Sequence, residues 1–454
     1  MLPSTRVRRQ GDTVKSATLC RMVRQSRPIQ RAGASELKRL KYSRNQISTR
    51  RTMSAPHQTT ADFSSVTHEN AVRGARDLVP VLRSRAAQAE AARIMPPETV
   101  ADLQALGAMR VLQPKRWGGM EHDYISYIDV PMELARGCAS ASWNVVNLMI
   151  HNWMLALYDE RAQAEVWGPN PAVLIAAGIA FPQGRARKVD GGYVISGKWN
   201  FSSCVNISEW CMLAVTLREN DKPVDFRMCL LHQSEYEIID DWHVMGMRST
   251  GSMTVVAKEV FVPEYKALGM LDARGGDTFP GAKSNPNPLY RVSLQAMGGH
   301  GIAATAVGNA MAALELTRTM VKERSTNYTG AKMRDFQAVQ LRVGAAGSKI
   351  DAARLLLRND CFDVMDIAHS KAIPDMETKL RYKRNAAFAA QLATEAVDAL
   401  HTVTGATGIY ASHPLERIFR DAHALAAHIS LNPDAHAATW GLVALGGDVN
   451  IPTL

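Results

Sequence analysis

Apolar and polar positions follow different periods in three successive stretches of the chain. From about residue 71 to 158, apolar side chains recur every three or four positions, which predicts helices. From 173 to about 268, short β-branched runs lie between turn residues, which predicts strands. From 293 to about 445, the helical spacing returns over long segments. Helices, strands and then helices, without alternating βαβ units, predict an α+β fold.

The same pattern gives expected elements and boundaries. Strands are expected at 193–196, 210–216, 228–231, 236–239 and 253–262, and helices at 303–322, 335–368, 376–404 and 415–427. Residues 269–290 are rich in Gly, Pro and Asn and are expected to form an exposed loop. The expected parts are a basic, disordered or non-native extension (1–60), an N-terminal helical domain (61–172), a middle β domain (173–268), a loop (269–292) and a C-terminal helical bundle (293–454).

Charge separates the N-terminal extension from the rest of the chain. The formal net charge is +10, but residues 1–52 hold 14 Lys and Arg with only two acidic residues. The remaining residues are nearly neutral, so they carry no charge pattern typical of a nucleic-acid-binding protein. The extension is a transit peptide, a disordered arm, or an upstream stretch that is not translated, with Met53 as the working start.

Cysteine spacing and hydropathy exclude several classes of protein. The six cysteines form no C-x-x-C pair, so neither a zinc site nor a disulfide framework is predicted. Free cysteines fit a reducing cytoplasm, which is the expected location. No apolar run reaches the roughly 18 residues that a membrane span requires, so no membrane association is expected.

Four common catalytic patterns are absent or incomplete. Residues 192–198 (GYVISGK) resemble the start of a phosphate-binding loop, but Trp199 stands where a metal-binding Ser or Thr is needed. Neither G-x-G-x-x-G nor G-x-S-x-G occurs, which argues against a Rossmann nicotinamide site and a Ser hydrolase. His423 and His428 are five residues apart on a predicted helix, so they face different directions and predict no metal site.

Eight short segments appear in one order along the chain. Together they resemble the acyl-CoA dehydrogenase superfamily over roughly residues 71–454, and they are most similar to its flavin-dependent monooxygenase branch, such as the oxygenase components of secosteroid-phenol hydroxylase and hydroxyphenylacetate hydroxylase. Each segment alone is a weak signal. The segments are 113–119 (QPKRWGG), 141–143 (ASW), 151–153 (HNW), 182–186 (PQGRA), 190–193 (DGGY), 199–203 (WNFSS), 246–252 (GMRSTGS) and 416–423 (ERIFRDAH).

This resemblance implies a fold and an activity. The fold would have an N-terminal helical domain, a middle β-barrel-like domain and a C-terminal four-helix bundle. The chain would be the oxygenase component of a two-component system, receiving reduced FMN or FAD from a separate NAD(P)H-dependent reductase. Oxygen would react with the flavin to give a C4a-hydroperoxyflavin, which hydroxylates a small aromatic, phenol-like substrate. The resemblance also implies a homotetramer.

The catalytic base of the dehydrogenases has no counterpart here. In the majority of them a Glu follows the R-D-A segment by about eight residues, but residues 422–433 contain no Asp or Glu, and Ile429 with His428 beside it occupies that place. In a minority the base comes from an earlier helix, yet no acid lies between Asp277 and Glu315. The resemblance implies a His at the place of His428, which is an expected catalytic residue together with Ser203. His428 would accept the proton of a phenol and also contact the flavin, with a structural core histidine as the alternative.

Further site residues follow from the resemblance. Ser203 would donate a hydrogen bond to flavin N5 and slow loss of hydrogen peroxide, with Ser202 and Phe201 along the same ring. Trp143 would form the aromatic wall of the pocket, or pack in the core. His151 would face the substrate, or be a core histidine. The alternative for Ser203 is a serine that satisfies local backbone groups.

The remaining expected cofactor contacts are more scattered. Arg324 resembles a position that contacts the flavin phosphate, with a solvated surface arginine as the alternative. Ala406 and Thr407 resemble a loop that approaches the flavin from a neighbouring subunit, while Gly178 and Ile429 are placed at the flavin of their own chain.

The sequence departs from the family pattern at three places. Cys204 stands where Gly usually follows the two serines, residues 176–178 (AAG) replace a run that often contains Ser, and Ser249 replaces a Gly. The first two departures lie close to the expected site, and they concern substrate identity and peroxide stability more than reaction type. The residues Arg248, Thr250 and Ser252 are expected to order a turn. Two other functions are kept open: an acyl-CoA dehydrogenase or flavin oxidase, and a non-catalytic flavin-binding scaffold.

Overall fold

The computed structural model describes residues 61–451 and 453–454. The basic extension expected at 1–60 lies outside these residues, so its three interpretations remain predictions. The first described residues are fixed by Arg110, whose guanidinium donates to the carbonyls of Ala61 and Trp117 at 2.7 and 2.6 Å. These contacts attach residue 61 to the helical part of the chain, in which α1 begins at His68.

The N-terminal part is helical, as the spacing of three and four predicts. Thr67 accepts a hydrogen bond from the Asn70 backbone at the first helix, and Pro97 opens the third, where its missing N–H costs nothing. The helices are α1 (His68–Asp77), α2 (Val79–Ala92), α3 (Pro97–Ala105), α4 (Ser126–Ala135), α5 (Ala139–Leu155) and α6 (Glu160–Trp167).

The middle part is a mixed eight-stranded sheet in the order β6-β7-β3-β2-β4-β5-β8, with β1 paired to β4. The pairs β1–β4 and β2–β4 are parallel, and the others are antiparallel. Asp190 and Gly191 form the two-residue turn between β2 and β3, where Gly191 has a φ of 70°. The strands are β1 (Ile175–Gly178), β2 (Gly184–Val189), β3 (Gly192–Ser202), β4 (Trp210–Glu219), β5 (Lys222–His232), β6 (Glu237–Ile239), β7 (Met253–Pro263) and β8 (Ala267–Gly269).

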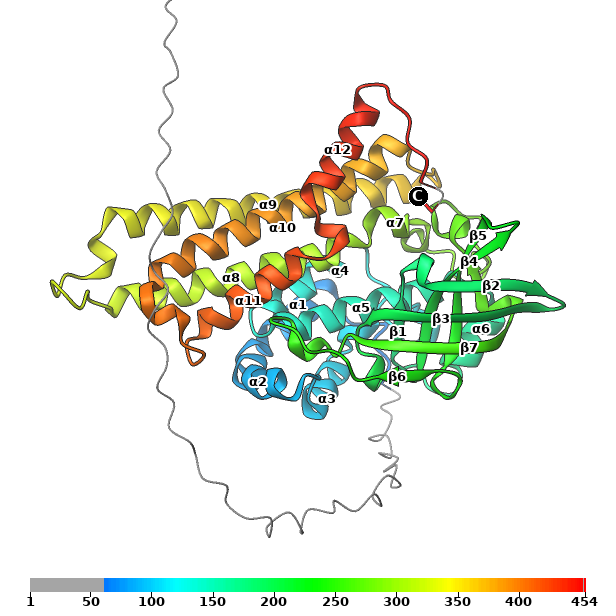
Figure 1. Cartoon of the computed structure of the whole chain (residues 1–454), viewed down its shortest axis with the longest axis horizontal. Coiled ribbons are helices and arrows are strands. Elements are labelled where there is room, and N and C mark those ends of the chain that lie inside the picture. The colour runs from blue at the N-terminus through cyan, green and yellow to red at the C-terminus, as the bar shows by residue number, and fades with distance from the viewer. Residues whose placement is uncertain (1–60, 452) are drawn as a thin grey trace, which may run out of the picture. The chain divides into compact units, whose positions relative to one another are not determined.

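The C-terminal part is helical again. The four predicted helices are confirmed, while α12 was not among them. Figure 1 shows the long helices α8, α9 and α10 side by side, with α11 packed against α8 and α10. The helices are α7 (Leu294–Met297), α8 (Gly299–Glu323), α9 (Gln337–His369), α10 (Met376–Thr404), α11 (Pro414–Ala426) and α12 (Pro433–Ala444).

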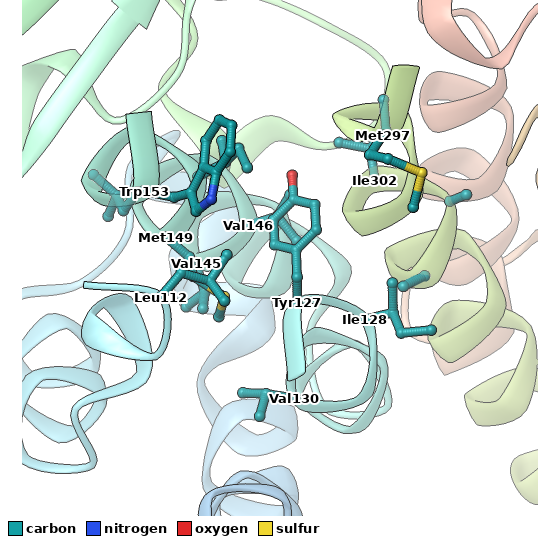
Figure 2. Packing of buried hydrophobic residues seen from close by; sticks show 14 of the residues in the cluster. Leu112, Tyr127, Ile128, Val130, Val145, Val146, Met149, Trp153, Met297 and Ile302 are labelled. Carbon is teal, nitrogen blue, oxygen red and sulfur yellow. The ribbon is translucent and has the colours of Figure 1, made fainter. Parts of the chain in front are cut away.

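The N-terminal and C-terminal helices share one apolar core. Figure 2 shows side chains of α4 and α5, among them Tyr127 and Val146, together with Ile302 at the start of α8. Each large apolar side chain buried in this way stabilises the fold by roughly 1.5–3 kcal/mol. Ser142 and Thr305 join α5 to α8 through hydroxyl groups 2.9 Å apart. The packing fixes α5, and with it the side chains that α5 presents to the sheet.

The expectation of an exposed loop at 269–290 is wrong for much of the segment. Phe279, Asn285 and Tyr290 are buried, with exposed fractions of 4%, 1% and 1%. The Asn285 side chain donates to the Ala156 carbonyl at 2.8 Å, and the Tyr290 hydroxyl to the Leu112 carbonyl at 3.2 Å. A composition rich in Gly, Pro and Asn excludes regular structure but not burial, because side-chain amides can satisfy the buried backbone.

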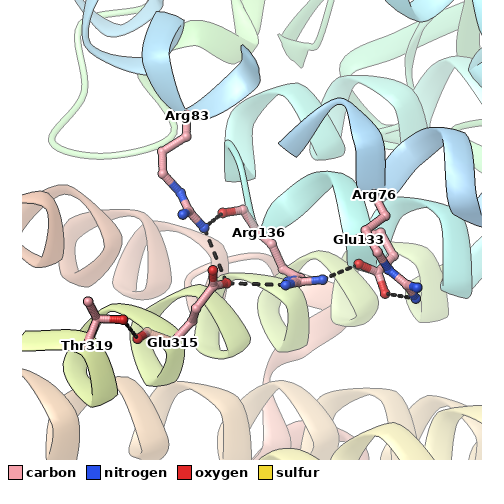
Figure 3. A network of polar contacts seen from close by, with 6 residues as sticks. All are labelled: Arg76, Arg83, Glu133, Arg136, Glu315 and Thr319. Carbon is pink, nitrogen blue, oxygen red and sulfur yellow. Dashed lines mark hydrogen bonds and ion pairs between the residues drawn. The ribbon is translucent and has the colours of Figure 1, made fainter. Parts of the chain in front are cut away.

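An ion-pair network joins the N-terminal helices to α8 (Figure 3). Glu315 on α8 contacts Arg83 and Arg136, both at 3.3 Å, and Arg136 also pairs with Glu133 at 2.5 Å. Burial raises the pKa of Glu133, but its two arginines lower it further, so the net pKa lies below the usual range. The carboxylate of Glu315 is therefore engaged in holding α8 against the N-terminal domain.

Cysteines and apolar helices show two further features of the described part. Five cysteines, at 138, 204, 211, 229 and 361, are free, and all except Cys138 are buried. Within residues 61–451 and 453–454, none of the helices combines the length and apolar character needed to cross a membrane.

Candidate active site

Three segments that are distant in sequence meet at one place. Trp143 of α5 donates its indole N–H to Ser203 Oγ at 2.9 Å, just past the end of β3. His428, which follows α11, lies edge-on to Trp143, with ring centroids 5.4 Å apart and an interplanar angle of 72°. Ser203 is nearly buried, whereas Trp143 and His428 are half-buried. The structure thus brings together three of the residues that the sequence predicts for the site.

The backbone around Ser203 is strained. Phe201 and Cys204 have φ angles of 65° and 62°, in the left-handed region that favours glycine. The pairing of β3 with β7 also shifts register between Trp199 and Ser202. Such strain costs of the order of 1–3 kcal/mol per residue and gathers at functional sites. It gives a physical reason why glycine commonly stands at the position of Cys204.

Ser203 begins a chain of buried hydroxyl groups. Its Oγ lies 2.7 Å from Ser252 Oγ, and Ser252 Oγ lies 2.7 Å from Thr250 Oγ1. Thr250 Oγ1 donates to the Met247 carbonyl at 2.9 Å, and the Met247 N–H donates to Asp421 of α11 at 2.6 Å. Thr250 and Ser252 therefore do more than order a turn, because they connect Ser203 to α11.

His428 is held in one tautomer by its own turn. It precedes the 3-10 helix η12 (Ile429–Leu431), and its Nδ1 accepts the Ser430 backbone N–H at 3.2 Å. The neutral ring then carries its proton on Nε2, which is a donor. Burial, reinforced by the positive charge of Lys383, lowers the pKa of His428 to about 4. The ring is therefore neutral at pH 7.

Lys383 was missed in the sequence because it is one cation among many on a long amphipathic helix. It lies on α10, where its ammonium donates to the Gln295 carbonyl at 3.1 Å. Burial lowers the pKa of Lys383, and no carboxylate among the described residues pairs with it. A half-buried cation close to His428 adds positive potential to this side of the site.

His151 lies in the core of the same region. Its Nδ1–H donates to the Ile175 carbonyl at 2.7 Å, and only 4% of the residue is exposed. Burial lowers the pKa of His151 to about 4, so the ring is neutral. The hydrogen bond ties α5 to β1, which matches the core alternative, while contact with substrate stays a prediction.

The other residues predicted beside Ser203 have distinct surroundings. A Cβ on Gly178 would lie 2.7 Å from Trp199 Cβ, so glycine is required by packing and only its backbone could meet a ligand. Ser202 is fully buried, and its hydroxyl has no hydrogen-bond partner among the described residues. Phe201 and Ile429 are 69% and 71% exposed. These large apolar side chains are free to be covered by a ligand or another chain.

Three predicted cofactor residues lie elsewhere in this chain. Arg324 follows α8 and donates to the Thr404 carbonyl at 2.8 Å, and Thr407 donates to the same carbonyl at 2.8 Å. Ala406 and Thr407 belong to the 3-10 helix η11 (Gly405–Ile409). Because α5 meets α8 at Thr305, Arg324 is roughly 28 Å further along that helix. One chain therefore does not bring Arg324, Ala406 and Thr407 to Ser203.

The described residues place no carboxylate against Trp143, Ser203 or His428. Asp434, the nearest acid in sequence to His428, is exposed at the start of α12. Asp421 is buried and accepts the Met247 N–H, and burial raises the pKa of Asp421 to about 6. Glu315 is held by two arginines. An enzyme that removes an α-proton with a carboxylate has no base at this place.

The residues present fit a flavin ring. The site offers an aromatic wall, a nearly buried hydroxyl in contact with it, an imidazole N–H and one buried hydroxyl without a partner, at Ser202. Planar heteroaromatic ligands are bound by such pockets, where aromatic walls combine with a few placed polar groups. The groups could hold the ring, but they supply no electron carrier of their own.

Family models match both helical parts of the chain. The N-terminal domain of acyl-CoA dehydrogenase matches residues 67–172, and the C-terminal domain of acyl-CoA dehydrogenase matches residues 300–433. The match to the second model includes α8 to α11 and His428, and the first includes Trp143 and His151.

Curated relatives and solved structures extend the similarity across the sheet. The oxygenase subunit HsaA of a flavin-dependent monooxygenase from Mycobacterium tuberculosis is 36% identical over 367 residues, covering 80% of this chain and 92% of that protein. The oxygenase component of an FADH(2)-dependent resorcinol hydroxylase from Rhizobium sp. is 34% identical, covering 83% and 93%. The crystal structure of the HsaA monooxygenase from M. tuberculosis aligns with a TM-score of 0.80 at 32% identity, covering 85% and 100%. XiaF from Streptomyces sp., solved in complex with FADH2 and glycerol, aligns with a TM-score of 0.79 at 27% identity, covering 85% and 98%.

Proposed function

Since the chain belongs to the flavin-dependent monooxygenase branch of the acyl-CoA dehydrogenase family, we propose that it hydroxylates a small phenolic substrate. It is the oxygenase component of a two-component system, and a separate reductase supplies its reduced flavin. The observation that carries the proposal is the meeting of Trp143, Ser203 and His428 at a place without a carboxylate. Relatives named for resorcinol and p-hydroxyphenylacetate support a phenolic substrate class.

The bound flavin would supply the chemistry, by activating oxygen and transferring one oxygen atom to the substrate. Ser203 and Trp143 would hold the ring, and the strained turn at Phe201 and Cys204 would keep Ser203 in place. Phe201, Ser202 and the backbone of Gly178 would line the same side. FADH2 in the names of two relatives supports FAD, and FMN is compared with it in the test below.

His428 is proposed to act on the substrate oxygen as a hydrogen-bond donor. Its Nδ1 already accepts the Ser430 N–H, so Nε2 carries the proton of the neutral ring. A pKa of about 4 also makes the ring a weak acceptor for the proton of a phenol. A donated N–H, with the charge of Lys383 nearby, would instead stabilise negative charge on that oxygen. The proton-acceptor role expected from the sequence is thereby less favoured.

A second copy of the chain is proposed to complete the cofactor site, within a homotetramer. Arg324, Ala406 and Thr407 lie together but away from Ser203 in their own chain. Helix α9 exposes small and apolar residues at alternating spacings of four and three, typical of a helix that packs against another helix. These exposed residues, named the α9 seam, are Leu341, Ala345, Ser348, Ala352, Leu355, Asn359 and Phe362. Packing of two such seams would bring the far end of one bundle toward another chain.

Finer features of the fold and location are proposed on the same basis. The sheet encloses a core of its own, including Ile195, Trp199 and Val255, which supports a barrel-like middle domain. Pairwise packing of α8, α9, α10 and α11 supports a four-helix bundle. The boundaries at 172, 268 and 292 and a cytoplasmic location stay predictions.

The proposal is tested by mixing the purified protein with reduced FMN or FAD, oxygen and a panel of phenols. Hydroxylated product, consumed oxygen and hydrogen peroxide are measured together. We expect product from at least one phenol with one of the two flavins. Tightly bound oxidised flavin that acyl-CoA bleaches would instead identify a dehydrogenase, and absence of binding of either reduced flavin would overturn the proposal.

A further inference from the structure

The hydroxyl chain that starts at Ser203 has one fixed end. Ser203, Ser252 and Thr250 have exposed fractions of 6%, 5% and 2%, so water takes little part in their hydrogen bonds. The chain ends on the Met247 carbonyl, which can only accept a hydrogen bond. The Met247 backbone is also held at its N–H, which donates to buried Asp421 at 2.6 Å. The direction of the whole chain therefore follows from this end.

Each hydroxyl has a single proton, and the contacts use all three. Thr250 gives its proton to the Met247 carbonyl, at 2.9 Å the shortest of the hydrogen bonds that this carbonyl accepts. Ser252 must then donate to Thr250, since two lone pairs without a proton form no hydrogen bond. By the same reasoning Ser203 donates to Ser252. Only this assignment satisfies every contact.

Because the Ser203 proton is donated to Ser252, the Ser203 hydroxyl can offer a ligand only its lone pairs. One lone pair accepts the Trp143 indole N–H at 2.9 Å, and one remains. A ligand at Ser203 must therefore bring an N–H or an O–H, because a ligand atom with only a lone pair would face another lone pair. Such a mismatch leaves a nearly buried acceptor unpaired, which is unfavourable.

We propose that Thr250 and Ser252 are positioning residues that fix Ser203 as a hydrogen-bond acceptor. This fixed direction is the physical source of the preference for reduced over oxidised flavin that a component supplied with reduced flavin requires. The inference rests on the proposed function, in which Ser203 faces N5 of the ring. Reduced flavin carries a hydrogen on N5, whereas oxidised flavin has only a lone pair there. The direction is the reverse of the donation from Ser203 that the sequence led us to expect.

The test compares the affinity for oxidised and reduced flavin, measured without oxygen, in the full-length protein and in two variants. In Ser252→Ala the Ser203 proton loses its acceptor and becomes free to bind oxidised N5. In Thr250→Val the Ser252 proton can turn toward Ser203, with the same result. We expect the preference for reduced flavin, taken as the ratio of the two dissociation constants, to fall by roughly 3- to 10-fold in each variant. The midpoint potential of the bound flavin should fall correspondingly.

Two controls separate the direction of the chain from general damage. Thr250→Ser keeps the hydroxyl and should keep the ratio of the wild type. Thr216→Val removes another buried hydroxyl that donates to a carbonyl, that of Phe181 at 3.1 Å, outside the chain, and should leave the ratio unchanged. If Ser252→Ala and Thr250→Val bind reduced flavin with the ratio of the wild type, the inference is wrong. If the wild type binds no reduced flavin, the proposed function itself fails.

Discussion

Two regions of the molecule carry residues that the sequence predicts at the flavin, and they differ in what one chain completes. At the candidate site, Trp143 contacts both Ser203 and His428, so side chains from three distant segments meet within a single chain. At the far end of α8, Arg324 and Thr407 both donate to the Thr404 carbonyl of their own chain. The difference teaches that a short sequence motif can identify a residue that binds the cofactor. The motif does not show whether that residue contributes to the site of its own chain or of another subunit.

The largest expected effect concerns His428 in the candidate site. His428→Ala removes the Nε2–H donor and should lower hydroxylation by roughly 10²- to 10³-fold, while oxygen is still consumed. His428→Gln keeps an N–H donor but cannot take up a proton, so it should retain much more product than His428→Ala. Product and hydrogen peroxide are measured in single turnovers. Equal loss of hydroxylation in both variants would favour the proton-acceptor role.

Acid should destabilise the fold through His151, a buried neutral histidine. His151 has a folded-state pKa of about 4, below the roughly 6.5 of an unfolded chain, so the unfolded chain binds more protons between these values. Stability is therefore lost as pH falls from about 6.5 to about 4, by roughly 3 kcal/mol for this residue. His151→Gln should show a shallower pH dependence of the free energy of unfolding in urea. The same change at exposed His243 is the control and should keep the slope of the wild type.

The far end of the bundle should depend on the α9 seam. Leu355 is 68% exposed in one chain, and Leu355→Glu would place a charge where the proposed second copy packs. We expect smaller assemblies by light scattering and flavin affinity reduced by more than about tenfold. Arg354→Glu, on a neighbouring exposed position outside the seam, should change neither. Unchanged assembly and affinity in Leu355→Glu would show that one chain binds the flavin without a second copy.

The smallest expected effect concerns the positive charge of Lys383 close to His428. Lys383 lowers the pKa of His428, so Lys383→Met should raise it toward the value of a free histidine. Histidine resonances followed by NMR during a pH titration measure this directly. Lys258→Met removes an exposed lysine of β7 and serves as the comparison. A pKa of His428 that does not rise in Lys383→Met would show that burial alone sets it.

Much of the fold could be predicted from periodicity. The four long C-terminal helices match their predicted ranges within a few residues, because apolar spacing and caps are local properties. Strands β1, β2 and β8 and helices α7 and α12 were not predicted. The polar strand β2 pairs between β3 and β4, and α12 buries none of its residues, so neither carries an apolar period. Burial at 279–290 was missed because it depends on contacts with distant helices.

The candidate site could be predicted from the sequence only in part. Ser203, Trp143 and His428 were indicated by short segments, and the structure brings them together. Thr250 and Ser252, which precede β7, showed only a turn signal in the sequence. Their connection to Ser203, and the direction of those hydrogen bonds, depend on which side chains meet in the folded chain. The tautomer of His428 likewise follows from the Ser430 N–H, which the 3-10 helix η12 brings against Nδ1. Identity of residues is thus more predictable than the direction of their bonds.

The free cysteines bear on how such a catalyst survives its own by-products. Burial raises the pKa of the thiols of Cys138, Cys204, Cys211, Cys229 and Cys361, so they stay protonated at neutral pH. Oxidants attack the thiolate far more readily than the thiol. A protein that handles activated oxygen within its own core can therefore keep sulfur in that core, because the fold leaves the sulfur in its unreactive form.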